Sequence, residues 1–279
     1  MIRTRLRVVE CGHCRHAEAM TQRGASWRVV DFPALVGVIE HPTEGVILFD
    51  TGYDAAFLAA TRSFPERLYG MATPVRLPAG ESAAERLAAL GIAPDDVRHV
   101  VISHFHGDHV AGLHRFPRAR LHCARAGLAD LRAHGRFGRV RRGLLSALVP
   151  ARIDDAAFFE DAPVVDLPGA FHPFARGADL IGDASLLGVE LPGHCPGHWG
   201  LALRVEDDRY VLMVADAAWS VVAIAQDAPP PVAVARLLGD PHAGRRTLHA
   251  LHRLGATRPD TVLLPSHCGR ASRRAGFQA

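Results

Sequence analysis

Ser103-His104-Phe105-His106-Gly107-Asp108-His109 is the stretch on which the rest of the chain depends. It follows residues 97–102, an apolar run rich in β-branched residues that is typical of a buried strand. Alternate residues of an extended segment point the same way, and a turn at Gly107 can bring His109 round to the side chains before it. Neutral imidazoles and carboxylates are the ligands that borderline divalent metals prefer. The stretch therefore predicts a metal site at the end of a strand.

Three more potential metal ligands occur where later strands are expected to end. His194 lies in a turn rich in Gly and Pro, Asp216 ends an apolar strand, and His267 follows the last strand of the chain. Each of them taken alone could be an ordinary turn residue. A sheet presents its chemistry at strand ends, however, and all three carry the same donor groups as the first cluster.

The composition is that of an ordinary soluble globular enzyme, with 48% apolar and 22% charged residues in a chain of 279. We predict a single domain over residues 1–279. No apolar run approaches the roughly twenty residues of a membrane span, and no signal-peptide block follows the basic start, so we expect a cytoplasmic protein without a membrane partner.

All 32 basic residues are Arg, which fits the composition of a GC-rich genome better than a nucleic-acid surface, and we expect no nucleic-acid partner. The five Cys residues lack a disulfide-like spacing, as expected in a reducing compartment. Cys11-Gly12-His13-Cys14, with His16 behind it, is either an ordinary loop, which we favour, or a second metal site.

Strands dominate each half of the chain, and helices separate them. This pattern predicts two packed sheets that are covered on the outside by helices. The expected strands are residues 6–9, 27–30, 35–39, 46–49, 97–102, 121–123, 164–167, 186–191, 201–205, 210–214 and 261–264. Helices are expected at residues 81–90, 125–134 and 245–254. The Arg-rich residues 134–160 are a solvated face or a lid.

The chain resembles the metallo-β-lactamase superfamily in the order of seven residues, His104-x-His106-x-Asp108-His109 followed by His194, Asp216 and His267. Asp50-Thr51-Gly52 matches the upstream Asp-x-Gly turn of that superfamily, and the resemblance covers about residues 30–268. It implies an α/β (α+β) fold, a four-layer αβ/βα sandwich of two mixed β-sheets with helices outside. It also implies two divalent metal ions at one edge, zinc in the first place, with iron, manganese and cobalt as alternatives.

The resemblance assigns roles position by position. The first metal would be held by His104, His106 and His194, the second by Asp108, His109 and His267, and Asp216 would bridge them. Asp50 would orient the His-rich loop through hydrogen bonds. Two cations about 3.5–4 Å apart can share a hydroxide and polarise a carbonyl or phosphoryl oxygen, and Asp108 can take up or return a proton.

Within the superfamily, the closest likeness is to the N-acyl homoserine lactone lactonases. Chain length, the turn over residues 193–198 and the helix before the final His all agree. Those lactonases commonly have Tyr three residues after the bridging Asp, whereas this chain has Trp219, whose indole N–H donates one hydrogen bond but cannot exchange a proton. We expect Asp108 and Trp219 to be catalytic, in a pocket covered by parts of residues 53–78 and 134–175.

The leading hypothesis is a dinuclear metal-dependent hydrolase that opens a lactone or cleaves a carboxylic ester of a small-molecule substrate. Two alternatives stay open, a phosphodiester, phosphotriester or thioester hydrolase on the same fold and a non-catalytic protein that binds a small metabolite. The sequence leaves both a monomer and a homodimer open. Five further residues have secondary expectations: pocket contacts for Tyr53 and His172, a hydrogen-bonding role for His198, and buried thiols for Cys195 and Cys268.

Overall fold

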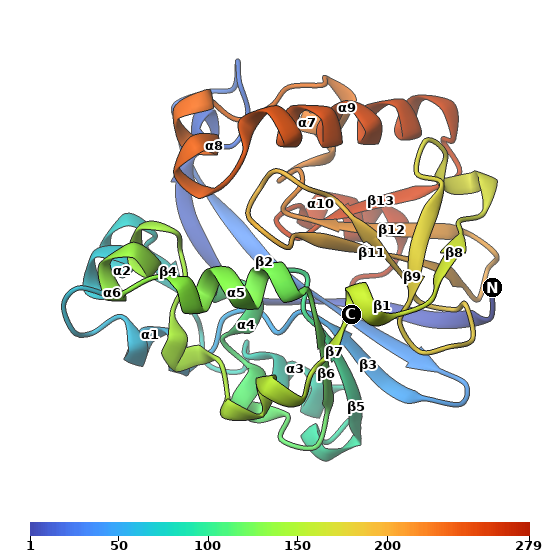
Figure 1. Ribbon diagram of the computed structural model, residues 1–279, viewed down its shortest axis with the longest axis horizontal. Coiled ribbons are helices and arrows are strands. Elements are labelled where there is room, and N and C mark those ends of the chain that lie inside the picture. The colour runs from blue at the N-terminus through green and yellow to red at the C-terminus, as the bar shows by residue number, and fades with distance from the viewer.

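The computed structural model describes residues 1–279, and its strands fall into two halves of the chain (Figure 1). The first half contains β1 (Arg3–Ala17), β2 (Val29–His41), β3 (Gly45–Phe49), β4 (Val75–Arg76), β5 (Val97–Val101), β6 (Arg120–Cys123) and β7 (Ala157–Phe158). The second half contains β8 (Val164–Asp166), β9 (Arg176–Asp179), β10 (Leu187–Glu190), β11 (Trp199–Val205), β12 (Tyr210–Ala215) and β13 (Val262–Pro265).

Helices follow or separate these strands. They are α1 (Ala55–Ala60), α2 (Arg67–Ala72), α3 (Ala83–Ala89), α4 (Gly107–Val110), α5 (Arg125–Ala133), α6 (Arg136–Arg141), α7 (Val221–Ala225), α8 (Val232–Leu238), α9 (Pro241–Thr257) and α10 (Gly269–Ala275). None of them combines the length and the apolar content that a membrane crossing requires.

The strands form two sheets that share one edge. The first has the order β7-β6-β5-β3-β2-β1, with β4 also on β1, and the second has the order β8-β9-β10-β11-β12-β13. A short parallel contact of β1 with β11, through Arg3 and Thr4, joins the two sheets. Apolar side chains such as Ile39, Phe49 and Leu203 fill the space between them.

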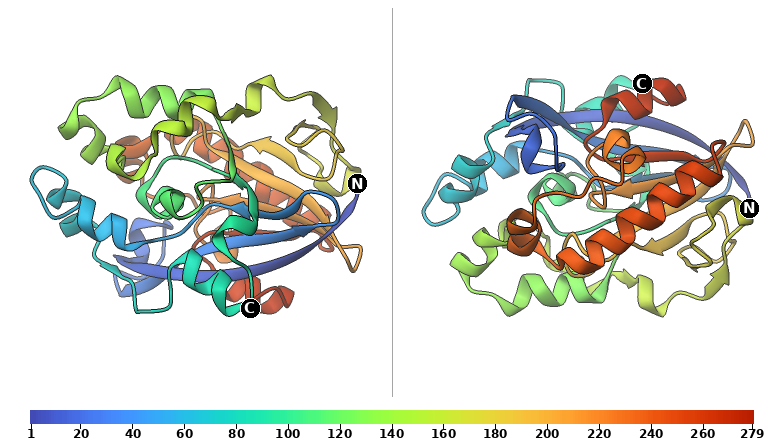
Figure 2. Two further views of the ribbon diagram at one scale, coloured as in Figure 1. Left: turned by 90° about the horizontal axis from the view of Figure 1, so that it is seen from below. Right: turned by 90° about the horizontal axis from the view of Figure 1, so that it is seen from above.

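Helices cover the outer face of each sheet, as Figure 2 shows from two sides. Leu87 of α3 and Leu128 of α5 pack on the first sheet, and Leu251 of α9 packs on the second. The order of layers is therefore helix, sheet, sheet, helix, which confirms the predicted sandwich of two mixed sheets.

Strand direction brings the chemistry to one edge. β3 and β5 run parallel, and so do β12 and β13. β10 runs antiparallel to β11, which runs antiparallel to β12, so β10 points the same way as β12. Segments that follow parallel strands leave the sheet at the same edge. Within the first sheet the loops at Asp50 and Ile102 therefore start from one edge, and within the second sheet so do those at Leu191, Asp216 and Ser266. Side-chain contacts between the two sets of loops, such as that of His109 with Asp216, show that the two edges meet.

Two expected strands, residues 27–30 and 35–39, are one strand in the structure. β2 runs through Pro33, which lies opposite His13 of β1. The register between the two strands shifts between Glu10 and His13. The missing N–H of proline therefore falls where the hydrogen-bond ladder is already irregular. Trp27 lies outside the strand and is 75% exposed. The Cys11–His16 segment, expected as a loop, is part of β1, and its thiols are buried in the core.

The helix boundaries follow from their caps. Ser82 caps α3 in a reciprocal capping box with Glu85, as the sequence indicated. α9 begins four residues earlier than expected because Asp240 accepts hydrogen bonds from the backbone N–H groups of His242 and Ala243, which precede the apolar stripe.

A pair of histidines, His99 and His122, lies on the neighbouring strands β5 and β6 and carries none of the candidate ligands. Nδ1 of His99 is 2.9 Å from Nε2 of His122, and the pair can share only one proton between these two atoms. Burial, followed by the nearby His99 and Arg120, lowers the pKa of His122 to about 3. In the pH range between the lowered and the ordinary pKa, His122 is therefore neutral in the folded protein and protonated in the unfolded chain.

We expect this difference in proton binding to make the protein less stable in acid. Between pH of about 6.5 and 3 the unfolded chain binds the extra proton, so the free energy of unfolding should fall by roughly 2–4 kcal/mol from this residue as the pH drops. Replacing His122→Gln keeps a donor and an acceptor but removes the titration. Urea unfolding of the wild type and the variant at several pH values measures how the free energy of unfolding depends on pH. The same pH dependence in both proteins would show that His122 does not cause the loss of stability in acid.

Candidate metal centre

The seven residues predicted as metal ligands converge at the edge of the sandwich where the strands end. Six of them are at most 8% exposed, and His194 is partly buried. They come from the β5–α4 segment, the turn after β10, the end of β12 and the segment after β13. Both sheets therefore contribute side chains to one site.

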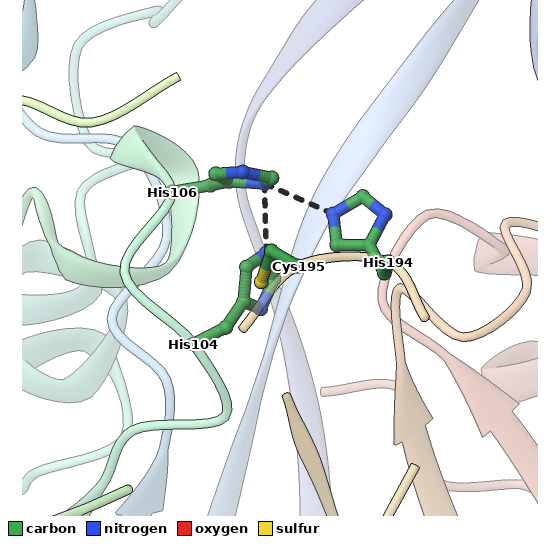
Figure 3. Close-up of side chains that lie close together, drawn as sticks. All are labelled: His104, His106, His194 and Cys195. Carbon is green, nitrogen blue, oxygen red and sulfur yellow. Dashed lines mark hydrogen bonds between the residues drawn. The ribbon is translucent and has the colours of Figure 1, made fainter. Parts of the chain in front are cut away.

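Three imidazoles form the first group of donors. Nδ1 of His106 lies 3.0 Å from Nε2 of His104 and 2.9 Å from Nε2 of His194. Figure 3 shows the three rings directed toward one point, with Cys195 beside His104. The sulfur of Cys195 lies within 4.8 Å of the donor nitrogens, so the buried thiol borders this group.

The second group lies beside the first. Nε2 of His267 is 3.3 Å and Nε2 of His109 is 3.5 Å from the same oxygen, Oδ2 of Asp108. Nitrogen and oxygen donors at this spacing can hold a metal ion, as can those of the first group.

Asp216 lies between the two groups. Its Oδ2 is 3.4 Å from Nε2 of His194 in the first group and 3.2 Å from Nε2 of His267 in the second. Its Oδ1 is 3.4 Å from Nε2 of His109. A carboxylate in this position reaches donors of both groups, which is the arrangement that a bridging ligand requires.

Buried donor atoms that lack hydrogen-bond partners indicate that the site fits divalent cations. Nε2 of His109 and Oδ1 of Asp216 are buried and have no hydrogen-bond partner, a costly state that a cation between them would remove. Burial raises the pKa of Asp216, but His267 and His109 outweigh this and hold it well below its usual value, so the carboxylate is charged. Burial, with His109 and His106, lowers the pKa of His104, which keeps its imidazole neutral.

Asp50 fixes the orientation of two candidate ligands. Nδ1 of His109 donates to Oδ2 of Asp50 at 2.7 Å, which leaves Nε2 of that ring free as a donor to a metal. Ser103 donates to Asp50 through both its backbone N–H and its hydroxyl, at 2.8 Å each. The Ser103 oxygen lies 2.9 Å from Nδ1 of His104, so one carboxylate organises the whole start of the loop. The expected orienting contacts of Asp50 are thus present.

Backbone groups orient the other candidate ligands. Nδ1 of His267 donates to the carbonyl oxygen of Pro33 at 2.7 Å. His198 accepts from the backbone N–H of Asp216 at 3.1 Å and donates to the carbonyl oxygen of Leu191 at 3.0 Å. His198 therefore supports the site by hydrogen bonding, as expected. Cys268 is buried behind the site, also as expected.

A cavity of about 340 Å³ opens above the donors. Tyr53, Tyr69 and Thr73 line it from the expected range 53–78, and Trp219 faces it. The Trp219 ring packs 4.2 Å from the His267 ring, centre to centre, on the side of the second group. Of the expected range 134–175 only Gly143 reaches the cavity, and His172 is exposed elsewhere.

Sequence reasoning missed much of the cavity wall. The additional lining residues come from the end of β1 and the turn after it, and from α8 and α9; they include Met20, Pro229, Val232, Ala235 and Leu238. The triple proline at residues 229–231, directly before an apolar segment, was the one available signal. Nothing in that signal shows that the segment folds back over the donors.

The chain matches the family model of the metallo-beta-lactamase superfamily over residues 29–267. It is 28% identical over 243 residues to the N-acyl homoserine lactonase AiiB of Agrobacterium fabrum, a match that covers 85% of this chain and 80% of that protein. It is 30% identical over 151 residues to the N-acyl homoserine lactonase AttM of the same organism, covering 50% of this chain. In the AttM comparison, the chain spans about half the length of that curated relative (49%).

Solved structures show the same fold at low identity. An N-acyl homoserine lactone hydrolase with the product N-hexanoyl-L-homoserine at its catalytic metal centre superposes with a TM-score of 0.72 at 17% identity, over 98% of this chain and 97% of that one. AidC, a dizinc quorum-quenching lactonase, superposes with a TM-score of 0.62 at 14% identity, over 96% and 89% of the two chains.

Replacing Asp50→Asn should weaken metal binding, because the amide cannot hold His109 and Ser103 in the present arrangement. Loss of such a supporting contact typically lowers metal affinity by about 10–100-fold. Competition with a chromophoric chelator measures the affinity, and Asp183→Asn, which alters a carboxylate beside the distant His41, is the matched control. Equal affinities in the two variants would show that Asp50 does not support the site.

Proposed function

The chain belongs to the metallo-beta-lactamase superfamily, and we propose that it is a metal-dependent hydrolase that opens lactones or cleaves related carboxylic esters. The observation that carries the proposal is the sharing of Asp216 between two groups of buried donors at the floor of a largely apolar cavity. The names of its relatives AiiB and AttM support the choice of a lactone among the substrates of such a site.

We propose two divalent cations as the cofactors. His104, His106 and His194 would hold one, Asp108, His109 and His267 the other, and Asp216 both. When bound, the two cations would lower the pKa of a shared water and polarise the substrate carbonyl. Zinc is the proposed metal, since these nitrogen and oxygen donors suit it and AidC is described as a dizinc enzyme.

The reaction consumes one water molecule and no side-chain nucleophile. The water oxygen bonds to the carbonyl carbon, the ester C–O bond breaks, and the released oxygen takes up a proton, which gives a hydroxy acid. We assign the transfer of that proton to Asp108, because its carboxylate lies among the donors and also lines the cavity.

Trp219 is the proposed contact on the side of the second group. Its ring is held in place by Phe32, with ring centres 5.1 Å apart, as well as by His267. The indole N–H can donate one hydrogen bond to a substrate oxygen but cannot supply a proton to it. Proton transfer is therefore left to Asp108.

The cavity indicates a substrate with an apolar part. A volume of about 340 Å³ lies at the lower end of the range for small-molecule sites, which is roughly 300–1,000 Å³. Apolar side chains of α8, among them Val232, Ala235 and Leu238, form part of the cavity wall. We propose that the substrate places its ester group at the donors and an acyl or alkyl chain against α8.

Purified protein should contain about two divalent cations per chain and should open simple and N-acylated lactones. Asp108→Asn should lower kcat by about 100-fold or more, because it removes both the group that transfers the proton and a proposed ligand of the second cation. Metal analysis and a pH-indicator assay of ring opening measure both quantities. A metal-loaded protein that cleaves a nitrophenyl phosphodiester faster than any lactone, ester or thioester would contradict the proposal.

Two substitutions in α8 test where the acyl or alkyl chain of the substrate binds. Ala235→Phe places a ring in the cavity, whereas Ala233→Phe places the same ring on the exposed side of α8. We expect Ala235→Phe to raise KM for long-chain lactones by about 10-fold or more, because a filled site cannot bury the chain, which contributes about 0.8 kcal/mol per methylene. Short-chain lactones should be nearly unaffected. If both variants changed the preference between long-chain and short-chain lactones equally, the acyl or alkyl chain of the substrate would not bind against α8.

A further inference from the structure

The hydroxyl of Tyr69 lies near the Cδ2–Nε2 edge of the His106 ring, and it comes from a helix that carries none of the candidate ligands. The ring belongs to α2, and its oxygen lies between the two glycines that flank His106. A methyl group added at Gly107 would be 3.3 Å from this oxygen, and one added at Gly143 would be 3.5 Å from it. A methyl group at Gly143 would also touch the His106 ring, at 3.1 Å from Cδ2. The phenol therefore borders the cavity directly beside His106.

Packing fixes the direction of this phenol before any substrate binds. Tyr53, Phe57 and Tyr69 form a row of edge-to-face rings with centres 5.1 and 5.3 Å apart. Gly107 makes room for the row, since a side chain there would approach the Phe57 ring to 2.6 Å. An ion pair between Arg136 of α6 and Glu66, just before α2, ties the helix down with contacts of 2.7 and 2.9 Å.

The hydroxyl proton of Tyr69 is not donated in a hydrogen bond within the protein. The Tyr69 oxygen lies beside the backbone of Gly107. No side chain accepts a hydrogen bond from Tyr69. A phenol is protonated at neutral pH, so Tyr69 presents one free donor to the cavity at the level of His106 and Asp108.

We propose that Tyr69 is a catalytic residue that donates a hydrogen bond to the carbonyl oxygen of the substrate as negative charge develops on it. The inference rests on the proposed esterase or lactonase activity. Tyr69 and Trp219 lie on opposite sides of the reacting group, the phenol beside His106 and the indole against His267. Tyr69 thus contacts the carbonyl oxygen, and Trp219 contacts the oxygen that leaves. A preorganised donor at this position stabilises the transition state more than the ground state.

The test is Tyr69→Phe, which removes the hydroxyl and keeps the ring row. We expect kcat for lactone opening to fall by about 10-fold or more while KM for the lactone and the metal content stay near those of the wild type. A binding measurement gives a second readout: calorimetric affinity for the ring-opened hydroxy acid, whose carboxylate replaces the carbonyl, should fall by about fivefold or more. Tyr210→Phe, which removes a phenol far from the cavity, is the control and should match the wild type.

The outcomes separate the two proposals. A wild-type protein that hydrolyses lactones, together with a Tyr69→Phe variant within about twofold of it in kcat and product affinity, would overturn the role of Tyr69 alone. A metal-loaded wild type that neither opens lactones or esters nor binds their hydroxy acids would overturn both. A fall in metal content that accounts for the whole loss of kcat would show that Tyr69 supports the donors and does not contact the substrate.

Discussion

The buried carboxylate of Asp216, held between imidazoles of both donor groups, is the interaction on which the site depends. A carboxylate that is 5% exposed has lost most of its water, and only opposite charge in contact with it can compensate. His109 and His267 supply part of that compensation, since their pKa values are raised by Asp108, Asp216 and, for His109, Asp50, against the opposing effect of burial. Divalent cations would supply it more completely and would also satisfy the atoms left without partners.

The sandwich makes this contact possible. Asp216 ends β12 and His267 follows β13 in the second sheet, whereas the His-rich loop follows β5 in the first. The two groups meet because the sheets pack face to face and the loops after β5, β12 and β13 come into contact, as the contacts of His109 with Asp216 and of His267 with Asp108 show. The apolar core between the sheets, which includes Phe49 and Leu203, fixes the distance between the two edges.

Around the donors, each contact has a defined task. Asp50, Pro33 and His198 orient ligands through hydrogen bonds, so the donor atoms face inward before a metal arrives. The aromatic row of α1 and α2 closes one side of the cavity, and Trp219 closes the other. α8 closes the far end with apolar side chains, none of which is fully buried in the core. These positions underlie the proposal that the charged donors at the floor of the cavity bind the ester group and that the apolar surface above them binds the acyl or alkyl chain.

The sequence by itself determined the class of fold, the strands that carry the donors, and the identity of the seven candidate ligands. Those features are local, since a strand followed by a His-rich turn is visible in consecutive residues, and the order of the ligands matched a known superfamily. It could not determine that Pro33 lies within a strand, that residues 229–248 wall the cavity, or that Tyr69 points at His106. Each of these depends on contacts between residues far apart in the chain, such as His13 with Pro33 or Gly143 with His106. Such contacts are set by how the sheets and helices pack, and only the tertiary structure decides them.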